Sequence, residues 1–244
     1  MNICITGASS GIGKALTEHL IKEGHIVWGI ARRKNILEEL KKGLPKNKFF
    51  FGVCDVRNIQ EIIKTKKEME KNNFFPDIII LGAGVSLNDL KPRYNLETYK
   101  KIFSVNLFGA INFIEIFLPD FLKIGKGQFI ALSSISAFRP SFRGVAYPAS
   151  KAALSLTFRG LNLNYKKQGI YFSNIYLGPV KTNMWEGKDS FLVSDPKKIA
   201  KSISRVIKTK RLIVFIPFLS TFIFRVSSLI PDRIYALLSE RFVK

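Results

Sequence analysis

Short apolar runs recur along the chain, and segments with helical spacing of their apolar residues separate them. Each run is four to seven residues long and lies near turn-forming residues, which is the pattern of a strand buried on both faces. Between the runs, apolar residues stand three or four positions apart, as at Ile12, Leu16 and Leu20, and this spacing predicts helices. The predicted strands cover residues 2–5, 26–30, 48–53, 77–81, 128–132, 171–177 and 212–216.

Strand and helix therefore alternate along the chain. Strands in this order pair in parallel through right-handed crossovers, and the crossover helices cover both faces of the sheet. No repeat or low-complexity linker divides the 244 residues. We expect one α/β domain over residues 1–244, with a doubly wound, seven-stranded parallel sheet.

A glycine-rich turn, TGASSGIG, occupies residues 6–13 between the first predicted strand and the first predicted helix. Glycines at this spacing allow a tight turn, let a pyrophosphate approach the backbone and let the helix pack closely on the strand. The N-terminus of the helix offers free N–H groups and a partial positive charge to phosphates. The turn predicts a dinucleotide-binding Rossmann fold, with cofactor contacts from Gly7, Ser9, Ser10, Gly11, Ile12 and Gly13.

Arg32 and Arg33 follow the second predicted strand, where this fold meets the adenosine ribose. An acidic residue there would hold the 2′-hydroxyl of NAD, whereas guanidinium groups suit the 2′-phosphate of NADP. The sequence predicts NADP(H) in preference to NAD(H). The alternative is that both arginines belong to a generally basic surface, because the net charge is +21.

Tyr147 and Lys151 stand four residues apart at the start of a predicted helix, so they share one helical face. A nearby ammonium group favours the phenolate, which makes Tyr147 a candidate to exchange a proton with an alcohol or a carbonyl. By itself this spacing is common on solvated helices. Ser134, however, follows the fifth predicted strand, where its hydroxyl would face the ligand crevice and hold the substrate oxygen.

In order and spacing, these motifs resemble the short-chain dehydrogenase/reductase family over about residues 1–216. The resemblance implies catalysis by Ser134, Tyr147 and Lys151, with Asn106, in VNLFG, supporting a water-linked proton path to Lys151. It also implies that Lys151 bonds the nicotinamide ribose and that Asp55 contacts the adenine. The further cofactor contacts it implies are Val56, Ala83, Gly84, Tyr147, Gly178, Val180 and Thr182.

Two segments depart from the pattern of the family. The usual Asn-Asn-Ala-Gly after the fourth strand is replaced by LGAG at residues 81–84, so the side-chain hydrogen bonds of the asparagines are absent. The usual Pro-Gly pair after the sixth strand is Leu177-Gly178, with Pro179 one place later. We expect the second change to alter how that loop turns toward the nicotinamide.

Two segments are predicted to select the substrate. Residues 183–195, with Met184, Trp185, Phe191 and Leu192, are expected to form a lid over an apolar pocket, the alternative being packing within the domain. Residues 217–244 form an apolar and basic extension, and residues 197–244 carry eleven basic and two acidic side chains. This composition allows peripheral membrane contact, a dimer contact or a wall of the substrate pocket.

We therefore expect a cytoplasmic, NADP(H)-dependent oxidoreductase that transfers a hydride between the nicotinamide and a carbonyl or secondary alcohol. The substrate is expected to be apolar, such as a lipid, a steroid or a ketone, and the protein a homodimer or homotetramer. Cys4 and Cys54 lie in apolar runs without metal-ligand spacing, so we predict reduced, buried thiols and no metal site. The alternatives are a catalytically silent NADP-binding protein and a basic nucleic-acid-binding protein, but no recognition motif supports nucleic acid.

Overall fold

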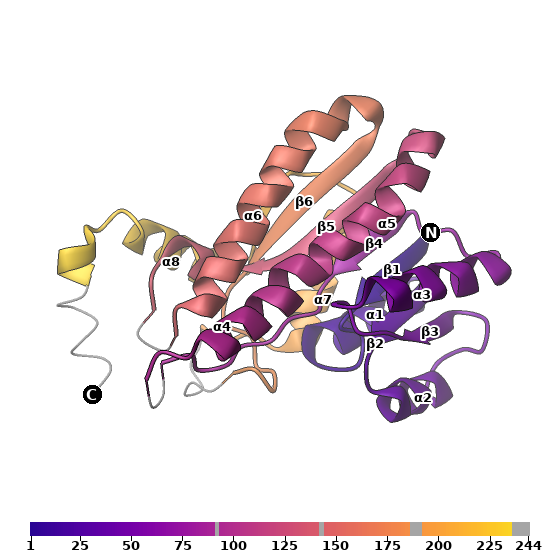
Figure 1. Ribbon diagram of the computed structural model, residues 1–244, viewed down its shortest axis with the longest axis horizontal. Coiled ribbons are helices and arrows are strands. Elements are labelled where there is room, and N and C mark those ends of the chain that lie inside the picture. The colour runs from indigo at the N-terminus through magenta and orange to yellow at the C-terminus, as the bar shows by residue number, and fades with distance from the viewer. Residues whose placement is uncertain (91–92, 142–143, 186–191, 236–244) are drawn as a thin grey trace.

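The computed structural model describes residues 1–90, 93–141, 144–185 and 192–235. At its centre lies a seven-stranded sheet in the order β3-β2-β1-β4-β5-β6-β7, and each neighbouring pair of strands is parallel (Figure 1). The sheet confirms the predicted seven-stranded parallel Rossmann fold. The strands are β1 (Asn2–Thr6), β2 (Ile26–Ala31), β3 (Phe49–Val53), β4 (Ile78–Leu81), β5 (Gly127–Ser134), β6 (Ile170–Leu177) and β7 (Ile213–Ile216).

Every predicted strand is present, and its ends differ from the prediction by at most two residues. The apolar runs predicted the strands because the central strands are covered on both faces. In β1, for example, Ile3, Cys4 and Ile5 are all fully buried, although successive side chains point to opposite faces. Cys54 is also buried, and both cysteines are free, as predicted.

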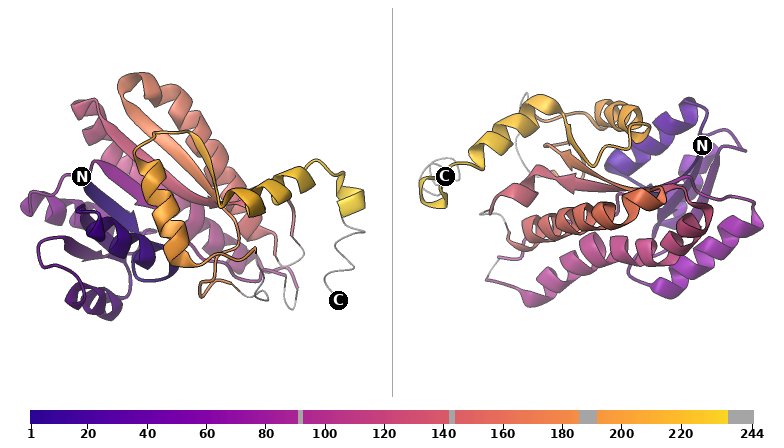
Figure 2. Two further views of the ribbon diagram at one scale, coloured as in Figure 1. Left: turned by 180° about the vertical axis from the view of Figure 1, so that it is seen from behind. Right: turned by 90° about the horizontal axis from the view of Figure 1, so that it is seen from above.

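Helices cover both faces of the sheet, as Figure 2 shows from behind and from above. Helices α1, α2 and α7 bury their apolar residues on one face, and α3, α5 and α6 bury theirs on the other. The helical elements are α1 (Gly11–Lys22), α2 (Lys34–Lys42), α3 (Ile59–Lys71), α4 (Leu96–Phe103), the π-helical turn η1 (Ser104–Phe108), α5 (Gly109–Ile124), the 3-10 turns η2 (Ile135–Phe138) and η3 (Lys166–Gln168), α6 (Ala146–Tyr165), α7 (Pro196–Ile207) and α8 (Phe218–Ser227).

The continuous helical run Leu96–Ile124, which joins α4, η1 and α5, is long and apolar enough to span a bilayer by length and composition. Its most apolar window has a mean hydropathy of 1.6, and 44% of that window is buried within the fold. Phe113, Phe117 and Phe121 lie in the core between α5 and the sheet. The apolar character of this run is that of a helix buried against the sheet.

Because all seven strands run in the same direction, their carboxyl ends share one edge of the sheet. The loops after β1, β2, β4, β5 and β6 therefore meet along this edge, and they carry most of the residues singled out in the sequence. In a doubly wound sheet, ligands bind in the crevice outside this carboxyl edge.

Candidate active site and cofactor cradle

The turn between β1 and α1 forms a cradle of backbone N–H groups. Gly7 and Gly11 adopt positive φ angles of 78° and 53°, and a Cβ on Gly13 would lie 2.2 Å from the carbonyl oxygen of Gly7. A side chain at position 13 would therefore force α1 away from β1. The Ser10 hydroxyl does not cap α1, so the first N–H groups of the helix stay available for an anion.

Arg33 links the end of β2 to this turn. Its Nη2 atom donates hydrogen bonds to Oγ of Ser9 at 3.0 Å and to Oγ of Ser10 at 2.9 Å. Arg32 points to the other side, and its Nη1 atom lies 3.8 Å from Oδ2 of Asp55. The two guanidinium groups thus lie between the phosphate-binding turn and the loop after β3, where the sequence predicts the adenosine end of the cofactor.

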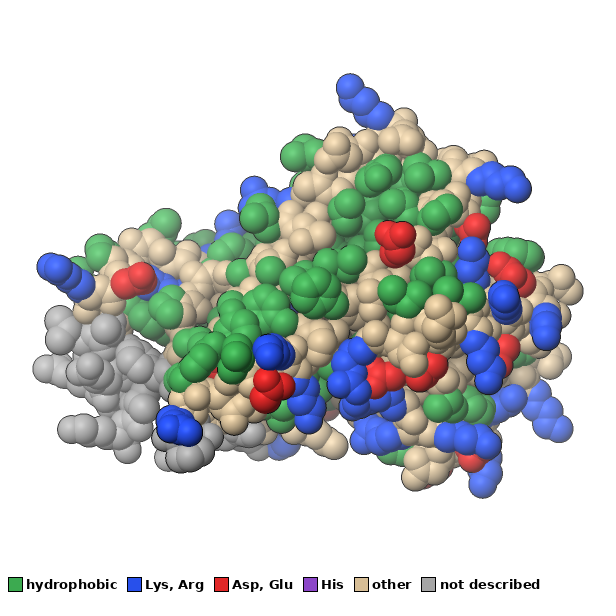
Figure 3. Space-filling model, viewed as in Figure 1, with side chains coloured by type: hydrophobic (Ala, Val, Ile, Leu, Met, Phe, Trp, Pro, Cys, Tyr) green, Lys and Arg blue, Asp and Glu red, His purple; other side chains and the backbone are tan. Residues whose placement is uncertain are grey.

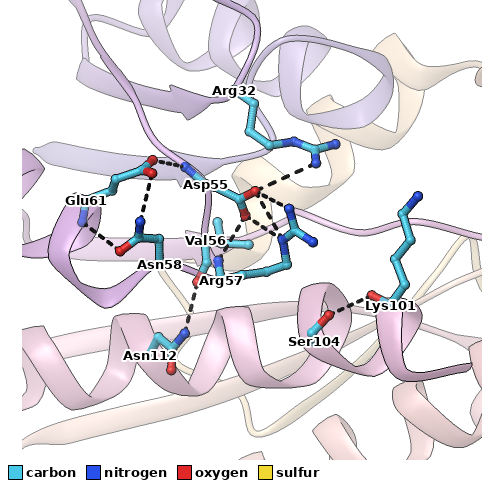
Figure 4. A network of polar contacts seen from close by, with 9 residues as sticks. All are labelled: Arg32, Asp55, Val56, Arg57, Asn58, Glu61, Lys101, Ser104 and Asn112. Atoms are coloured by element: carbon cyan, nitrogen blue, oxygen red, sulfur yellow. Dashed lines mark hydrogen bonds and ion pairs between the residues drawn. The ribbon is translucent and has the colours of Figure 1, made fainter. Parts of the chain in front are cut away.

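Asp55, directly after β3, is held in place by Arg57 (Figure 4). Nε of Arg57 donates to Oδ1 of Asp55 at 3.0 Å and Nη2 donates to Oδ2 at 2.6 Å. The hydrogen bonds from Arg57 hold the pKa of the Asp55 carboxyl below its usual value. The adjacent Val56 is fixed through its carbonyl oxygen, which accepts from Nδ2 of Asn112 at 3.0 Å.

The loop after β4 is held by Thr6 instead of by asparagine side chains of its own. Oγ1 of Thr6 accepts from the backbone N–H groups of Gly82 and Ala83, both at 3.1 Å. A Cβ on Gly82 would lie 2.9 Å from the carbonyl oxygen of Thr6 and 3.0 Å from Cδ1 of Leu132. A side chain at position 82 would therefore require β1 or the loop after β4 to shift. Ala83 and Gly84 still lie at the crevice edge.

Ser134 and Tyr147 come together above the end of β5. Oγ of Ser134 accepts from the backbone N–H of Ser136 at 3.2 Å, which places the Ser134 side chain at the start of η2. The Tyr147 hydroxyl forms a side-chain hydrogen bond with Ser134. Burial raises the pKa of Tyr147 above its usual value, and the bond with Ser134 acts in the opposite direction.

Lys151 is buried one helical turn after Tyr147. Its Nζ atom donates to the carbonyl oxygen of Leu132 at 2.8 Å and lies 5.8 Å from the centre of the Tyr147 ring. Burial lowers the pKa of Lys151 to about 8, because a charged amine loses hydration inside the fold. The chain thus places a phenol, a hydroxyl and an amine of lowered pKa at one point of the crevice.

Asn106 lies in the π-helical turn η1, directly beside this group. Its Oδ1 accepts from the backbone N–H of Val85 at 2.8 Å, and its Nδ2 donates to the carbonyl oxygen of Val85 at 3.0 Å and to Oγ of Ser150 at 3.1 Å. Ser150 in turn donates to the carbonyl oxygen of Tyr147 at 2.8 Å. Asn106 therefore joins the loop after β4 to the first turn of α6.

The segment after β6 approaches the cradle from the opposite side. The backbone N–H of Gly178 donates to the carbonyl oxygen of Ile216 at 2.9 Å. Val180 pairs with Ser194 as an isolated parallel bridge. Thr182 reaches the glycine-rich turn, since a Cβ on Gly11 would lie 3.1 Å from Cγ2 of Thr182. Of the predicted lid, Met184, Trp185 and Leu192 are described, whereas Phe191, with the rest of residues 186–191, lies outside the described residues.

Within the described parts of the chain, no three His, Cys, Asp or Glu side chains come together as they would around a metal ion. The cradle does fit a dinucleotide, because the N-terminus of α1 is uncapped and position 13 admits only glycine.

Sequence comparison adds to this geometry. Residues 1–192 match the short chain dehydrogenase family. The chain belongs to the short-chain dehydrogenase/reductase family. An uncharacterized oxidoreductase of Staphylococcus epidermidis is 31% identical over 187 residues, which are 76% of this chain and 80% of the relative. A 3-oxoacyl-[acyl-carrier-protein] reductase of Buchnera aphidicola is 29% identical over 186 residues, covering 76% of each chain.

Solved structures show the same short-chain dehydrogenase/reductase fold. A short-chain dehydrogenase from Streptomyces avermitilis superposes with a TM-score of 0.82 at 24% identity, covering 98% of this chain and 94% of the other. A serine dehydrogenase in its closed form with NADP⁺ has a TM-score of 0.81 at 21% identity, covering 88% and 94%. The family match and the curated relatives identify the protein as an oxidoreductase of the short-chain dehydrogenase/reductase family.

In this short-chain dehydrogenase, the structure also brings two residues to the site that the sequence analysis had not singled out. The carboxylate of Asp89 is fully buried and accepts from the backbone N–H groups of Val145 and Ala146 at 2.9 and 3.0 Å, at the start of α6. Arg57 orients Asp55, as described above. Asp89 gave no signal in the sequence because its partners lie more than fifty residues away, whereas Arg57 was detectable as a base two positions from an acid.

Proposed function

We propose that the protein is an NADP(H)-dependent oxidoreductase that interconverts a carbonyl group and a secondary alcohol of an apolar substrate. The observation that carries this proposal is the meeting of Ser134, Tyr147 and Lys151 at the carboxyl edge of the sheet, on the side of the crevice that faces the phosphate cradle. The fold alone hosts many chemistries, so the argument rests on these three side chains.

The cofactor would lie across the carboxyl edge. The turn after β1 would hold the pyrophosphate, Arg32 and Arg33 the 2′-phosphate, and Asp55 the adenine. Structures of similar fold with bound NADP, such as the serine dehydrogenase, support a nicotinamide cofactor at this edge. The residues proposed to hold it are Gly7, Ser9, Ser10, Gly11, Ile12, Gly13, Arg32, Arg33, Asp55, Val56, Ala83, Gly84, Tyr147, Lys151, Gly178, Val180 and Thr182.

When bound, the nicotinamide would supply the hydride for reduction or accept it in oxidation. In the reductive direction, Oγ of Ser134 would donate a hydrogen bond to the substrate carbonyl, and the Tyr147 hydroxyl would give its proton to the same oxygen. The resulting phenolate needs a nearby positive charge, which Lys151 provides while it is protonated. Asn106 would act by holding the loop after β4 against α6 and by supporting proton supply to Lys151.

An apolar substrate is supported by the aromatic side chains beside Ser134. Phe138, which ends η2, is partly exposed, and its ring centre lies 4.8 Å from that of Tyr176 and 6.1 Å from that of Phe215. The predicted lid adds Met184 and Trp185. Apolar side chains next to Ser134 would favour a lipid-like, steroid-like or simple ketone substrate.

We further propose that residues 1–244 act as one domain in a cytoplasmic homodimer or homotetramer, with peripheral membrane contact treated below. The free, buried thiols of Cys4 and Cys54 fit a reducing compartment. The outward sides of η1 and α6 expose Phe108, Leu156 and Leu163, which is apolar surface available for a second copy.

Replacing Tyr147 with Phe tests the mechanism, because it removes the proton donor and keeps the ring. We expect the rate of carbonyl-dependent NADPH oxidation to fall about a hundredfold or more, with NADPH binding retained. The assay compares ketones, acyl chains, steroids and quinones as substrates, each with NADPH and with NADH. Tyr165→Phe, at the far end of the same helix, is the matched control and should leave the rate unchanged.

Three outcomes would contradict the proposal. Activity that persists in Tyr147→Phe would remove Tyr147 from the mechanism, and a preference for NADH would overturn the assignment of Arg32 and Arg33. Wild-type protein that binds NADPH but turns over none of the four substrate classes would favour the catalytically silent alternative.

A further inference from the structure

Helix α8 presents an apolar face to the outside of the molecule. Phe218, Leu219, Phe222, Ile223 and Val226 are all exposed, with 70% of Phe218 and 61% of Leu219 accessible. Residues at this spacing lie on one side of an α-helix. The helix therefore carries a continuous hydrophobic stripe that the described fold does not cover.

The buried side chains of α8, which pack on the protein, are small and polar. Ser220 and Thr221 are 2% and 0% exposed. A Cβ on Gly178 would lie 2.5 Å from Oγ of Ser220, so glycine at this position lets α8 approach the loop after β6. A helix on a globular surface normally buries its apolar stripe. In α8 the apolar stripe faces outward instead, and the close contact between Ser220 and Gly178 holds the helix in this orientation.

The chain after α8 is anchored to the loop that begins at Ser134. The buried Arg139, which follows η2, donates through Nη1 to Oδ1 of Asp232 at 3.1 Å and through Nη2 to the carbonyl oxygen of Ile230 at 2.6 Å. Its guanidinium carbon lies 4.3 Å from the centre of the Tyr235 ring. The exposed stripe thus has a defined position beside the candidate active site, and Figures 1 and 2 show this part of the chain projecting from the body.

Exposed basic side chains lie at the start of α7, in α8 and just after α8. Helices α7 and α8 both begin at the carboxyl edge of the sheet, and Lys197, Lys198 and Lys201 are exposed in the first turns of α7. Arg225, in α8, and Arg233, after it, are exposed, and Figure 3 shows basic and hydrophobic side chains side by side on this projecting end. The exposed basic side chains at this end of the molecule would repel the same end of a second copy, whereas an anionic surface would attract them.

We propose that α8 binds the surface of an anionic phospholipid bilayer. The stripe from Phe218 to Val226 enters the boundary between headgroups and acyl chains, and the lysines of α7 approach the lipid phosphates. This inference rests on the proposed function in one respect: the bilayer supplies the apolar carbonyl substrate to the crevice beside α8. Lipid binding itself does not require turnover.

Co-sedimentation of the full chain with vesicles tests this inference. One set of vesicles contains phosphatidylcholine alone and the other contains phosphatidylcholine with phosphatidylglycerol. We expect binding to the second set, weakened by added sodium chloride, and little binding to the first. No cofactor or substrate is present, so a failure here is distinguishable from a failure of the Tyr147→Phe experiment.

Phe218→Glu tests the apolar stripe. Position 218 is the first residue of α8, where an acidic side chain is compatible with the helix. We expect the vesicle partition coefficient to fall about tenfold or more, because one large aromatic side chain no longer leaves water. Phe75→Glu, at a site that is 59% exposed between α3 and β4, is the matched control and should bind like the wild type. Unchanged NADPH affinity checks the fold of both variants.

Lys197→Glu combined with Lys198→Glu tests the charge. We expect about a tenfold or larger loss of binding to the anionic vesicles. The matched control is Lys166→Glu with Lys167→Glu in η3, an exposed pair at the opposite edge of the sheet whose replacement changes the net charge equally. Equal losses from the two pairs would show that only total charge matters, and would overturn the assigned surface.

The inference is also overturned if the wild type binds neither kind of vesicle, or if Phe75→Glu loses as much binding as Phe218→Glu. Analytical ultracentrifugation gives the remaining readout. A lower molecular mass of Phe218→Glu than of the wild type would show that a second copy of the chain covers the stripe.

Discussion

Burial controls the charge of Lys151, and with it the proton chemistry proposed for Tyr147. The lowered pKa of about 8 means that the amine is protonated below this pH and neutral above it. A neutral amine no longer stabilises the phenolate that forms when Tyr147 gives up its proton. Carbonyl reduction should therefore depend on pH in a range where an ordinary lysine does not titrate.

We predict that kcat/KM for NADPH-dependent carbonyl reduction falls above pH 8 by about tenfold per pH unit, because only the protonated fraction of Lys151 is active. Steady-state rates measured across this range test the prediction. Lys151→Arg provides the comparison, since a guanidinium stays charged and any remaining activity should lack the break. A wild-type profile without a break near pH 8, or the same break in Lys151→Arg, would contradict this account.

At the scale of elements, the helix that carries Tyr147 and Lys151 is held at its N-terminus by a residue from a different loop. The first N–H groups of a helix have no partner within the helix. In α6, Asp89 accepts hydrogen bonds from Val145 and Ala146 and thereby supplies that partner from the loop after β4. A carboxylate at a helix N-terminus also interacts favourably with the helix dipole. Asp89 is thus a positioning residue for α6.

Asp89→Ala should lower the free energy of unfolding by about 2 kcal/mol, since two N–H groups at the start of α6 lose their acceptor. It should also lower kcat, because the first turn of α6 positions Tyr147. Urea denaturation and steady-state kinetics measure the two effects. Asn95→Ala is the control, because Asn95 caps α4 in an exposed position by accepting from the backbone N–H of Thr98 at 2.9 Å. We expect this variant to lose about 1 kcal/mol of stability without an effect on kcat. Equal effects on kcat in both variants would contradict the role of Asp89.

At the scale of the whole molecule, apolar surface remains uncovered on the outward sides of the helices α4, α5 and α6. Figure 3 shows hydrophobic side chains gathered over this face. Leu163 on α6 is 79% exposed, and Leu156, two turns earlier, is exposed on the same helix. A patch of this kind marks a protein interface more often than it marks free surface.

We predict that Leu163→Arg shifts the protein from a dimer or tetramer toward a monomer, because a charged side chain would be buried at the contact. Size-exclusion chromatography with light scattering measures the mass. Phe75→Arg, which introduces the same charge at a distant exposed site, should leave the mass unchanged. A monomeric wild type, or a Leu163→Arg variant of unaltered mass, would rule out an interface through α6.

The strands and the site segments of this protein could be predicted from its amino-acid pattern. Strands of a parallel sheet are buried on both faces, so their apolar runs are visible without knowledge of the fold, and all seven lie where the pattern predicts them. The glycine turn and the Tyr147-Lys151 spacing could also be recognised, because each depends only on residues close together in the sequence. These features were sufficient to predict the family and the fold.

Contacts between distant residues could not be predicted and follow from the packing of the folded chain. The capping of α6 by Asp89, the bonds from Arg33 to Ser9 and Ser10, and the outward direction of the apolar stripe on α8 depend on packing between segments far apart in the chain. The pattern of α8 alone predicts an apolar face but not the side to which it turns. The close approach of Ser220 to Gly178 fixes that side, and no local periodicity encodes a contact of this range.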